Sequence, residues 1–473
     1  MRVLPSQRIR KVEDRTSIAG PRRLGTVGLG QVEVPFTSPL AQVLPGQKLW
    51  DRPLDVANDA RRMKDALAGV ADLDLSKVAP LEVFSPYPLA VQPAMMARFQ
   101  RAAQALAVAL PALVAARFSD PEVKARLPLS PRIEALLAQI PHPYRVGSFR
   151  PDVLLGQDGS VRICEINARF PTNGYFVSEG ATAALHQIGP EHRVISAHAK
   201  IRDAMMARFD LARPLHVLRG EEKGGDIHLF TQTVAARGGE PITVGPGGLS
   251  TRDGHLYADG RRVEQCVLEL HQAELLGLSD PVLLALARTQ NSLNDLRTVF
   301  VAHDKRLFAL LSDEKLMTRL VGKVVARTLS ETVAETKMVG QLDAAAQAAI
   351  VNARGEWVLK PNLFGKGKGV ELGKNLSAEA MRQALQDPEH QAWVLQRYLP
   401  PAELPVVDAA ASQAGLVKSE PQKVVGLLLC LDGEYFGPGI FRASSDDIVN
   451  VARGGSILVP TAAESQGRWR TRG

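Results

Sequence analysis

A stretch rich in glycine and lysine near the end of the chain has the residue types that can hold a phosphate group. It runs from Trp357 to Gly373 and reads W-V-L-K-P-N-L-F-G-K-G-K-G-V-E-L-G. Its apolar start predicts a short buried strand that carries Lys360 at its end. Glycine and lysine then alternate through Gly365, Lys366, Gly367, Lys368 and Gly369. Such glycines let backbone N–H groups approach a phosphate closely, although a solvated basic hairpin explains the same residues.

Two common phosphate-binding motifs are excluded for this stretch. The Walker A pattern Gly-x-x-x-x-Gly-Lys-Ser/Thr occurs nowhere in the sequence. The dinucleotide-binding turn Gly-x-Gly-x-x-Gly is absent from the stretch as well. A nucleotide bound here would therefore be held by a strand lysine and a flexible glycine-rich loop.

An earlier hairpin carries oxygen-bearing side chains that suit a hard divalent cation. The letters R-P-D-V-L-L-G-Q-D-G-S-V-R-I-C-E-I-N predict two strands joined by an Asp-Gly turn. Alternation along the second strand puts Glu165 and Asn167 on one face, in line with Val161 and Ile163. Asp152 on the first strand could add another oxygen for Mg²⁺. The alternative is an edge strand whose polar end meets water.

Two further cationic residues stand at the ends of predicted elements. Lys315 falls in the first turn of a helix for which Ser312 is the expected cap. It could reach a nucleotide phosphate, although the local sequence alone favours a surface lysine. Arg442 ends a strand that returns from a turn at Asp432-Gly433.

The elements that must position these residues fall into five predicted segments. Helices are expected over 55–67, 94–118 and 133–140, and a mobile crossing over 400–423. The segments are 1–145, mainly helical; 146–209, with the hairpin; 210–300, a small inserted α/β block; 301–462, with Lys360; and 463–473, a disordered tail.

Composition limits the class of protein. The 473 residues are 45% hydrophobic and 23% charged, as in ordinary globular proteins. The net charge of +7 favours anionic ligands, but the arginines are spread along the chain and form no nucleic-acid stripe. The cysteines are Cys164, Cys266 and Cys430, whose spacing supports neither a disulfide scaffold nor a zinc site.

The sequence gives no sign of secretion or of a membrane span. Its first residues lack an apolar h-region. The longest apolar stretch, Ala102–Ala116, is too short to cross a bilayer and contains Pro111. We therefore expect a soluble, cytoplasmic protein.

Taken together, these pieces resemble the circularly permuted ATP-grasp ligases, the group of glutathionylspermidine synthetase and eukaryotic glutathione synthetase. The resemblance covers about residues 145–460 in one consistent order. R-P-D-V-L-L and C-E-I-N are similar to the metal segment, and L-L-S-D-E-K-L-M, W-V-L-K-P, the glycine loop and V-L-Q-R-Y to the ATP-binding pieces. The implied fold class is α+β, a circularly permuted, glutathione-synthetase-like ATP-grasp fold with an inserted small α/β domain and a helical N-terminal region.

The resemblance also implies which residues do the work. Mg²⁺ would be bound by Asp152, Glu165 and Asn167. Lys315 and Lys360 would contact ATP phosphates under the loop Gly365–Gly369, and Gln396 to Tyr398 would form the hinge beside adenine. Arg150 would face the acceptor substrate near Thr172 and Asn173, and Arg442 would stabilise charge on the transferred phosphoryl group.

Two departures from the family pattern stand out. The glycine segment has lysines where eukaryotic glutathione synthetase has a metal-binding carboxylate, which leaves the number of metal ions open. No cysteine precedes Cys164, so the amidase of the bifunctional members is not expected.

The implied activity is that of an ATP-dependent carboxylate–amine ligase working through an acyl phosphate, with ADP and phosphate released. Such phosphoryl transfer needs positioning and charge neutralisation rather than a protein nucleophile. The expected partners are a small acid and an amine of the amino acid or polyamine class, without nucleic acid or membrane. The alternatives are an ATP-grasp phosphotransferase acting on a small molecule and a non-catalytic basic protein that binds nucleic acid.

Overall fold

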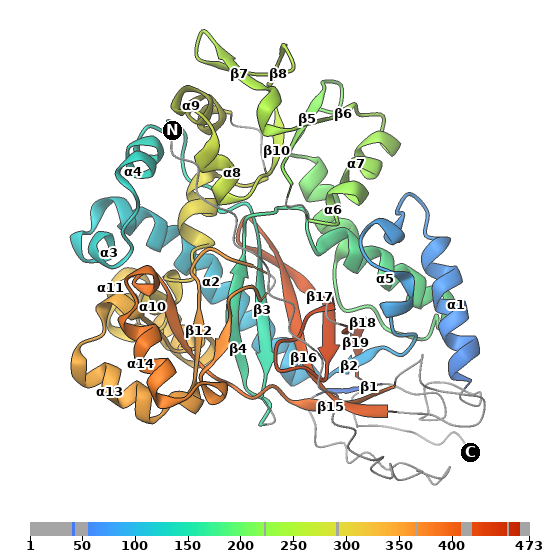
Figure 1. Ribbon diagram of the computed structural model, residues 1–473. Coiled ribbons are helices and arrows are strands. Elements are labelled where there is room, and N and C mark those ends of the chain that lie inside the picture. Colours follow the sequence, from blue (N-terminus) through green and yellow to red (C-terminus); the bar gives the residue numbers. More distant parts are fainter. Residues whose placement is uncertain are drawn as a thin grey trace, which may run out of the picture. The chain divides into compact units, whose positions relative to one another are not determined.

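The computed structural model describes residues 55–156, 158–221, 224–289, 293–365, 367–407, 419–451 and 454–463, together with the backbone of residues 40–42. Within this part, helices and sheets are mixed along the chain (Figure 1). This mixture agrees with the α+β prediction. Predictions for the chain start, Lys366 and the tail lie outside the described residues, and the predicted domain boundaries stay predictions.

A six-stranded antiparallel sheet lies at the centre of the site described below. Its order is β18-β17-β16-β3-β4, and β15 pairs with β16. The strands are β3 (Ser148–Leu155), β4 (Val161–Asn167), β15 (Glu403–Val407), β16 (Ser419–Leu431), β17 (Glu434–Ser444) and β18 (Ser456–Leu458). Asp432 and Gly433 join β16 to β17 with φ of 51° and 85°, as a tight hairpin turn requires.

A second antiparallel sheet carries the strand lysine. Its order is β11-β14-β12-β13. The strands are β11 (Thr336–Met338), β12 (Trp357–Lys360), β13 (Glu371–Leu372) and β14 (Val394–Arg397), and the helices α13 (Ala344–Asn352) and α14 (Ala378–Gln386) share its apolar core. The strand predicted before Lys360 is therefore confirmed.

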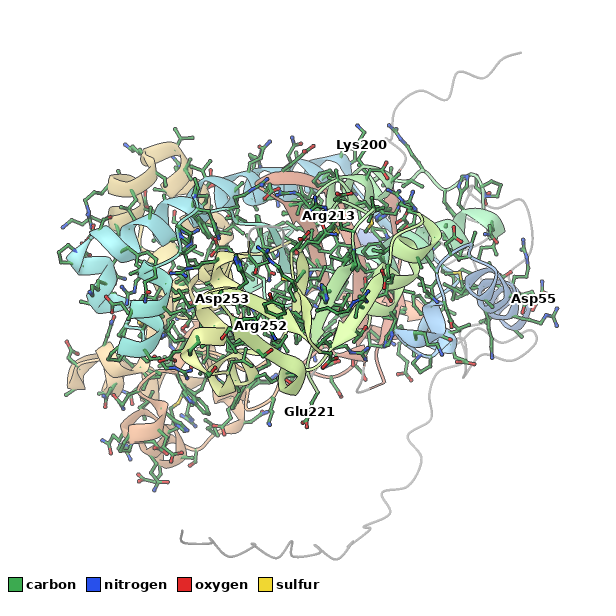
Figure 2. All side chains as sticks on the ribbon, turned by 90° about the horizontal axis from the view of Figure 1, so that it is seen from above. Asp55, Lys200, Arg213, Glu221, Arg252 and Asp253 are labelled. Carbon is green, nitrogen blue, oxygen red and sulfur yellow. The ribbon has the colours of Figure 1, made fainter. Side chains whose placement is uncertain are left out.

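The predicted α/β block is built on a parallel sheet of order β10-β5-β6. It consists of β5 (Leu215–Arg219), α7 (Ile227–Ala236), β6 (Pro241–Val244) and β10 (Cys266–Glu269). A small sheet of β7 (Leu249–Arg252), β8 (His255–Ala258) and β9 (Arg261–Arg262) adjoins it in sequence. Arg252 and Asp253, at the turn after β7, are labelled in Figure 2.

Some helices pack on the two faces of the six-stranded sheet, and others pack elsewhere in the described structure. The remaining described helices are α1 (Val56–Ala68), α2 (Pro93–Ser119), α3 (Pro121–Arg126), α4 (Pro131–Ala138), α5 (Tyr175–Ile188), α6 (His198–Met206), α8 (Gln272–Gly277), α9 (Asp280–Arg288), α10 (Leu307–Leu311), α11 (Glu314–Val321) and α12 (Lys323–Thr332). Phe99 of α2 packs on Phe441 of β17 with ring centroids 6.3 Å apart. On the other face, α5 packs against β17 in a second apolar cluster. A further sheet joins β1 (Leu40–Gln42), β2 (Leu89–Val91) and β19 (Pro460–Ala462).

Helix α2 corrects the prediction about the apolar stretch. It runs for 27 residues straight through Pro111, and by length and composition it could cross a membrane. The argument that this part is too short was therefore wrong, because the helix extends beyond the apolar run. About half of its apolar part (56%) is buried inside the described structure, and the helix packs against α12 and β17.

Two smaller predictions also need correction. The helix with Lys315 is capped by Asp313, whose side chain accepts from the Leu316 N–H at 3.0 Å, whereas Ser312 closes the preceding helix by donating to the Phe308 carbonyl. Part of the predicted mobile crossing is a strand, β15, paired with β16 from residue 419. Pro405 and Pro421 oppose each other in this pair at an edge of the sheet, where proline is tolerated.

A β-bulge in β4 corrects the face assigned to Glu165. Asp152 pairs with Glu165, but the next residue of β3, Val153, pairs with Ile163, so Cys164 is an extra residue. One extra residue reverses the alternation of side chains beyond it. Glu165 therefore points away from the face of Ile163 rather than in line with it. Strict alternation, which the prediction assumed, does not allow for such a bulge.

Candidate active site

Five polar residues from three strands share one face of the six-stranded sheet, here called the polar face: Arg150, Asp152, Glu165, Asn167 and Arg442. Directly opposed residues of an antiparallel pair point to the same side. Arg150 opposes Asn167, and Asp152 opposes Glu165. Arg442 joins them through the register of β16, which pairs with both β3 and β17.

Within the polar face, Asp152 is held on both of its oxygens. Arg442 donates to Oδ2 at 2.6 Å, and the Asn167 amide nitrogen donates to Oδ1 at 3.1 Å. This carboxylate therefore fixes the direction of the arginine. The amide oxygen of Asn167 stays available for another partner.

The strand lysine lies on a face of the second sheet together with neutral polar groups. Lys360 donates to the Gln396 side-chain oxygen at 2.5 Å, and Gln396 donates in turn to the Thr336 hydroxyl at 3.2 Å. A neutral amide orients the ammonium group without cancelling its charge. Burial lowers the pKa of Lys360, and the nearby acidic groups oppose this shift.

The two sheets bring Glu165 and Lys360 together, as the sequence predicted. Burial alone would raise the pKa of Glu165, but the charges of Lys305 and Lys360 outweigh it and lower the pKa to about 2. Lys305 Nζ lies 3.0 Å from Oε1 of Glu165, an oxygen without another hydrogen-bond partner in the described structure. A carboxylate and two ammonium groups thus lie near one another, and the strands β4 and β12 that carry Glu165 and Lys360 are neighbours in Figure 1.

Lys305 was missed by the sequence analysis, which chose Lys315 instead. Lys315 is exposed in the first turn of α11, and no described contact links it to Glu165 or Lys360. Lys305 follows a π-helical turn, Thr298–Ala302, in the letters H-D-K-R. No periodic sequence pattern predicts such a turn. The one sequence feature that could have pointed to Lys305 is its place just before an apolar helix.

The glycine-rich loop is tied to the site by its first residues. The Lys305 ammonium donates to the Phe364 carbonyl at 2.5 Å, and Arg169 donates to the Leu363 carbonyl at 3.3 Å. Gly367 and Gly369 have φ of 71° and 70°, a backbone conformation that favours glycine. The loop therefore starts beside Glu165, where it can cover a bound phosphate.

The remaining predicted loop and hinge residues differ in their contacts, and only Gln396 bonds directly to Lys360. Lys368 is exposed, with its ammonium 5.3 Å from the centre of the Phe364 ring. Tyr398 accepts a hydrogen bond from Lys374 at 3.3 Å. The adenine hinge at Gln396 to Tyr398 stays a prediction, and the structure gives Gln396 a direct bond to Lys360.

A cavity of about 400 Å³ adjoins the polar face and is here called the open cavity. Arg150 and Asn167 connect it to the polar face, and Gly365 connects it to the glycine loop. The full lining among the described residues is Lys77, Val78, Arg150, Asn167, Arg169, Phe170, Asn173, Gly224, Gly225, His228, His303 and Gly365. Arg150 and Asn173 thus face one space, and their part in binding a substrate stays a prediction. Thr172 lies behind it and donates to Glu269 at 2.8 Å.

Two buried carboxylates stand behind the open cavity. Burial raises the pKa of Glu269 to about 7, against hydrogen bonds from Thr172 and the charge of Arg150. Burial also raises the pKa of Asp226 to about 6, against backbone N–H bonds at the start of α5. Asp226 accepts from the Val177 N–H at 3.0 Å and so caps α5. Of the two acids, Glu269 is therefore the one that is partly protonated near neutral pH.

His303 contributes an acceptor to the open cavity. Its Nδ1 lies 2.9 Å from the Ile166 carbonyl and 3.4 Å from the Ala168 nitrogen, and the shorter contact favours the tautomer with the hydrogen at Nδ1. Its Nε2 has no partner among the described residues. Burial lowers the pKa of His303 to about 3, with the charges of Arg169 and Lys305 adding to the effect. The ring is therefore neutral at physiological pH.

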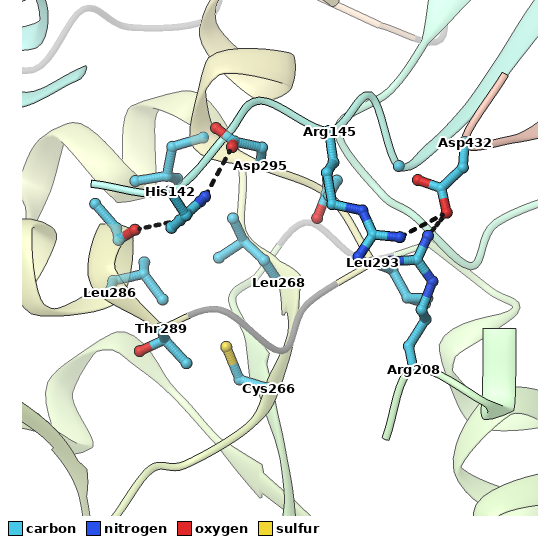
Figure 3. A pocket seen from close by; sticks show the side chains of 14 residues that line it. His142, Arg145, Arg208, Cys266, Leu268, Leu286, Thr289, Leu293, Asp295 and Asp432 are labelled. Atoms are coloured by element: carbon cyan, nitrogen blue, oxygen red, sulfur yellow. Dashed lines mark hydrogen bonds and ion pairs between the residues drawn. The ribbon is translucent and has the colours of Figure 1, made fainter. Parts of the chain in front are cut away.

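A second cavity, of about 50 Å³, is here called the paired cavity (Figure 3). Asp432 accepts from Arg145 at 3.5 Å and pairs with Arg208. Asp295 pairs with Arg297 at 2.6 Å and lies 3.7 Å from His142. This space is large enough for water but not for a substrate, and its charges cancel internally.

The polar face fits a hard divalent cation in part. Glu165 Oε1 is paired with Lys305 at 3.0 Å and has no other partner in the described structure, and the Asn167 amide oxygen is free of the bond to Asp152. Both are oxygen donors of the kind Mg²⁺ prefers. Asp152 is already held by two donors, and the described residues contain no group of three His, Cys, Asp or Glu side chains that could hold a metal. Glu165 and Asn167 are therefore the better candidates.

Comparison with known proteins finds similarity to a family model and to a curated relative. A family model described as the AnkG N-terminal domain matches residues 102–301, which include β3, β4 and the α/β block. A curated relative, "ATP-grasp enzyme ankG" of Aspergillus thermomutatus, is 25% identical over 439 residues, covering 80% of this chain and 88% of the relative. Neither description mentions glutathione or glutathionylspermidine.

Proposed function

We propose that the chain is an ATP-grasp enzyme that joins a carboxylic acid to an amine, a carbon–nitrogen ligase dependent on ATP. The observation that carries this proposal is the meeting of Glu165, Lys305 and Lys360 between two sheets, beside a glycine-rich loop. The similarity to a relative called an ATP-grasp enzyme supports the use of ATP. The open cavity next to this group supports a second, acidic substrate.

In the first step, a carboxylate oxygen of the acid attacks the γ-phosphorus of ATP. The bond from phosphorus to the β,γ-bridging oxygen breaks, which gives an acyl phosphate and ADP. Lys305 and Lys360 bind phosphate oxygens, and Arg442, directed by Asp152, stabilises charge on the transferred group. A Mg²⁺ ion held by Glu165 and Asn167 would supply further charge neutralisation.

In the second step, the amine nitrogen attacks the carbonyl carbon of the acyl phosphate. The bond from that carbon to the phosphate oxygen breaks, phosphate leaves with the electron pair, and the amine proton passes to the released phosphate or to water. The glycine-rich loop, anchored at Leu363 and Phe364, keeps water from the acyl phosphate during this interval. No protein nucleophile is required.

The test combines the purified chain with Mg-ATP, a panel of acids and a panel of amines. Release of ADP and phosphate is measured together with the mass of any condensed product. Free phosphate and an amide that need both substrates support the ligase. A phosphorylated product without condensation would replace it by a phosphotransferase. Absence of ATP turnover, with steeply salt-dependent binding of DNA or RNA, would favour a binding protein.

A further inference from the structure

Lys305 contacts both a candidate metal ligand and the base of the glycine-rich loop. Its Nζ lies 3.0 Å from Oε1 of Glu165 and donates to the Phe364 carbonyl at 2.5 Å. The residue is only 5% exposed, so this ammonium group has little access to water. One buried charge therefore holds a carboxylate of β4 and the loop after β12 at the same time.

The backbone of Lys305 is fastened to the loop base independently of its ammonium group. The Lys305 N–H donates to the Asn362 carbonyl at 3.2 Å, and the Asn362 side chain donates to Asp304 at 3.3 Å. Asp304 is almost fully buried and pairs with Arg306 at 2.7 Å. The segment therefore stays attached to the loop base when the Lys305 ammonium changes its partner.

The Lys305 ammonium and a metal ion at Glu165 oppose each other. Mg²⁺ lies about 2.1 Å from its oxygen ligands, so on Oε1 of Glu165 the two cations would be at most about 5 Å apart. Like charges at this range repel more strongly in a buried site than in water. A metal on the second oxygen of Glu165 would face the same ammonium from slightly further away. The pair between Lys305 and Glu165 therefore lowers the affinity of this carboxylate for a divalent cation.

Building on the metal site of the proposed function, we infer that Lys305 opposes metal binding until a triphosphate is present. The phosphate oxygens of a nucleotide offer the ammonium a second charged partner, and its transfer to them frees Glu165 for the metal. Metal and triphosphate therefore bind cooperatively, and by linkage each raises the affinity for the other. Lys305 is in this way a positioning residue for the metal as well as a phosphate ligand.

The first test measures Mn²⁺ binding without nucleotide, by the EPR signal of the free ion. Mn²⁺ takes the same oxygen ligands as Mg²⁺. Lys305→Gln removes the charge and keeps a hydrogen-bond donor for Phe364, and we expect the Kd for Mn²⁺ to fall at least about tenfold. Lys315→Gln is the control, because Lys315 is exposed and has no described contact with Glu165. An unchanged or higher Kd in Lys305→Gln would overturn the inference, since a lysine that serves phosphate alone leaves this Kd as it is.

A second pair of variants tests whether the gain passes through Glu165. Mn²⁺ is titrated into Glu165→Gln and into the double variant Lys305→Gln/Glu165→Gln. We expect weak binding in both, without a gain from the loss of Lys305, because the two residues act as a pair. The same gain with glutamine at position 165 would show that the ammonium acts on another site, and the inference would fail.

The unaltered chain gives an independent measurement, which does not depend on how a variant folds. Formaldehyde and a borane reductant methylate accessible lysines, and mass spectrometry reads the rate at each position. Saturating Mn²⁺ should release Lys305 from Glu165 and speed its methylation at least about threefold, as the loss of one ion pair allows. The rate at Lys315 should stay the same. A rate at Lys305 that Mn²⁺ leaves unchanged contradicts the inference.

These measurements separate the inference from the proposed function because none of them uses turnover. A chain that condenses no acid with an amine, but gains Mn²⁺ affinity in Lys305→Gln, supports the inference without the ligase. Firm Mn²⁺ binding that Lys305→Gln does not change contradicts the inference and leaves the metal site standing. Mn²⁺ binding in none of the chains would remove the metal site from the proposed function and the inference with it.

Discussion

The open cavity and the paired cavity are both lined by arginine, but only in the paired cavity do these arginines pair with an acid of the described lining. In the paired cavity, Asp432 forms ion pairs with both Arg145 and Arg208. In the open cavity, Arg150 has no described hydrogen bond or ion pair, although its charge acts on the buried Glu269. The first arrangement pairs its charges within the chain, whereas the second leaves the Arg150 Nε without a hydrogen-bond partner in the described structure.

This difference separates what stabilises the fold from what serves a ligand. A charge that is paired within the chain contributes to folding, and its loss leaves a buried partner unsatisfied. A charge left without a partner lowers stability and is retained for binding. Substitutions in the paired cavity should therefore affect unfolding, whereas substitutions around the open cavity and Lys360 should affect turnover.

The largest effect is expected from Lys360→Met. The change removes the ammonium that Gln396 orients and that the proposed function assigns to the triphosphate, and we expect ATP-dependent turnover to fall about a thousandfold. Because burial disfavours the charged form of Lys360, the unfolding temperature should stay the same or rise. ADP release and thermal unfolding check the two parts. Lys200→Met, on the exposed side of α6, is the matched control, and near-normal turnover in Lys360→Met would contradict the proposed site.

The second-largest effect is expected on the pH dependence of the free energy of unfolding, through Glu269. Its pKa is raised from 4.5 to about 7 in the folded chain, so the folded state binds more protons between these values. Stability is therefore full below the unfolded pKa and is lost as pH rises through 7, by up to about 3 kcal/mol. In Glu269→Gln the free energy of unfolding should depend less on pH between 5 and 8. Urea titrations of both proteins at several pH values measure this, and parallel profiles would refute it.

A smaller loss, of stability alone, is expected from Asp432→Asn. Asparagine tolerates the left-handed φ of 51° at this turn but leaves Arg208 without its charged partner. We expect the free energy of unfolding to fall by about 2 kcal/mol, with turnover unchanged within about twofold. Asp253→Asn is the control, because Asp253 has a φ of 52° and no described ion pair. A loss of turnover in Asp432→Asn without a loss of stability would contradict the assignment of the paired cavity to stability alone.

The smallest effect is expected from Lys368→Gln. This lysine is exposed and contacts the Phe364 ring rather than an acid. Its charge can attract the triphosphate only through solvent, where one such contact is weak. We expect the KM for ATP to rise about threefold with kcat unchanged. Steady-state kinetics at low and high salt check it, and a fall in kcat like that of Lys360→Met would give the loop lysine a direct part in the chemistry.

Local signals predicted much of the fold. The hairpin of β3 and β4, the strand before Lys360 and the turn at Asp432-Gly433 follow from apolar runs and turn residues. The helix over 55–67 is observed as Val56–Ala68, with Asp55 as its cap. These elements need only their own residues to be specified.

Features that depend on the rest of the fold could not be read in this way. The bulge at Cys164 is defined by the pairing of two strands, and β15 forms only because β16 offers it an edge. Two capping residues, Ser312 and Asp313, stood side by side, and the wrong one was chosen. Lys305 acquires its place through Glu165 and Phe364, which local sequence does not reveal.

The extra residue in β4 makes the position of the candidate metal ligands independent of the exact length of the strand. Deleting Cys164 would leave Ile163 and Glu165 as chain neighbours opposite Val153 and Asp152, so Glu165 and Asn167 would keep their side of the sheet. Relatives with or without one residue at this position would therefore hold these side chains on the same face.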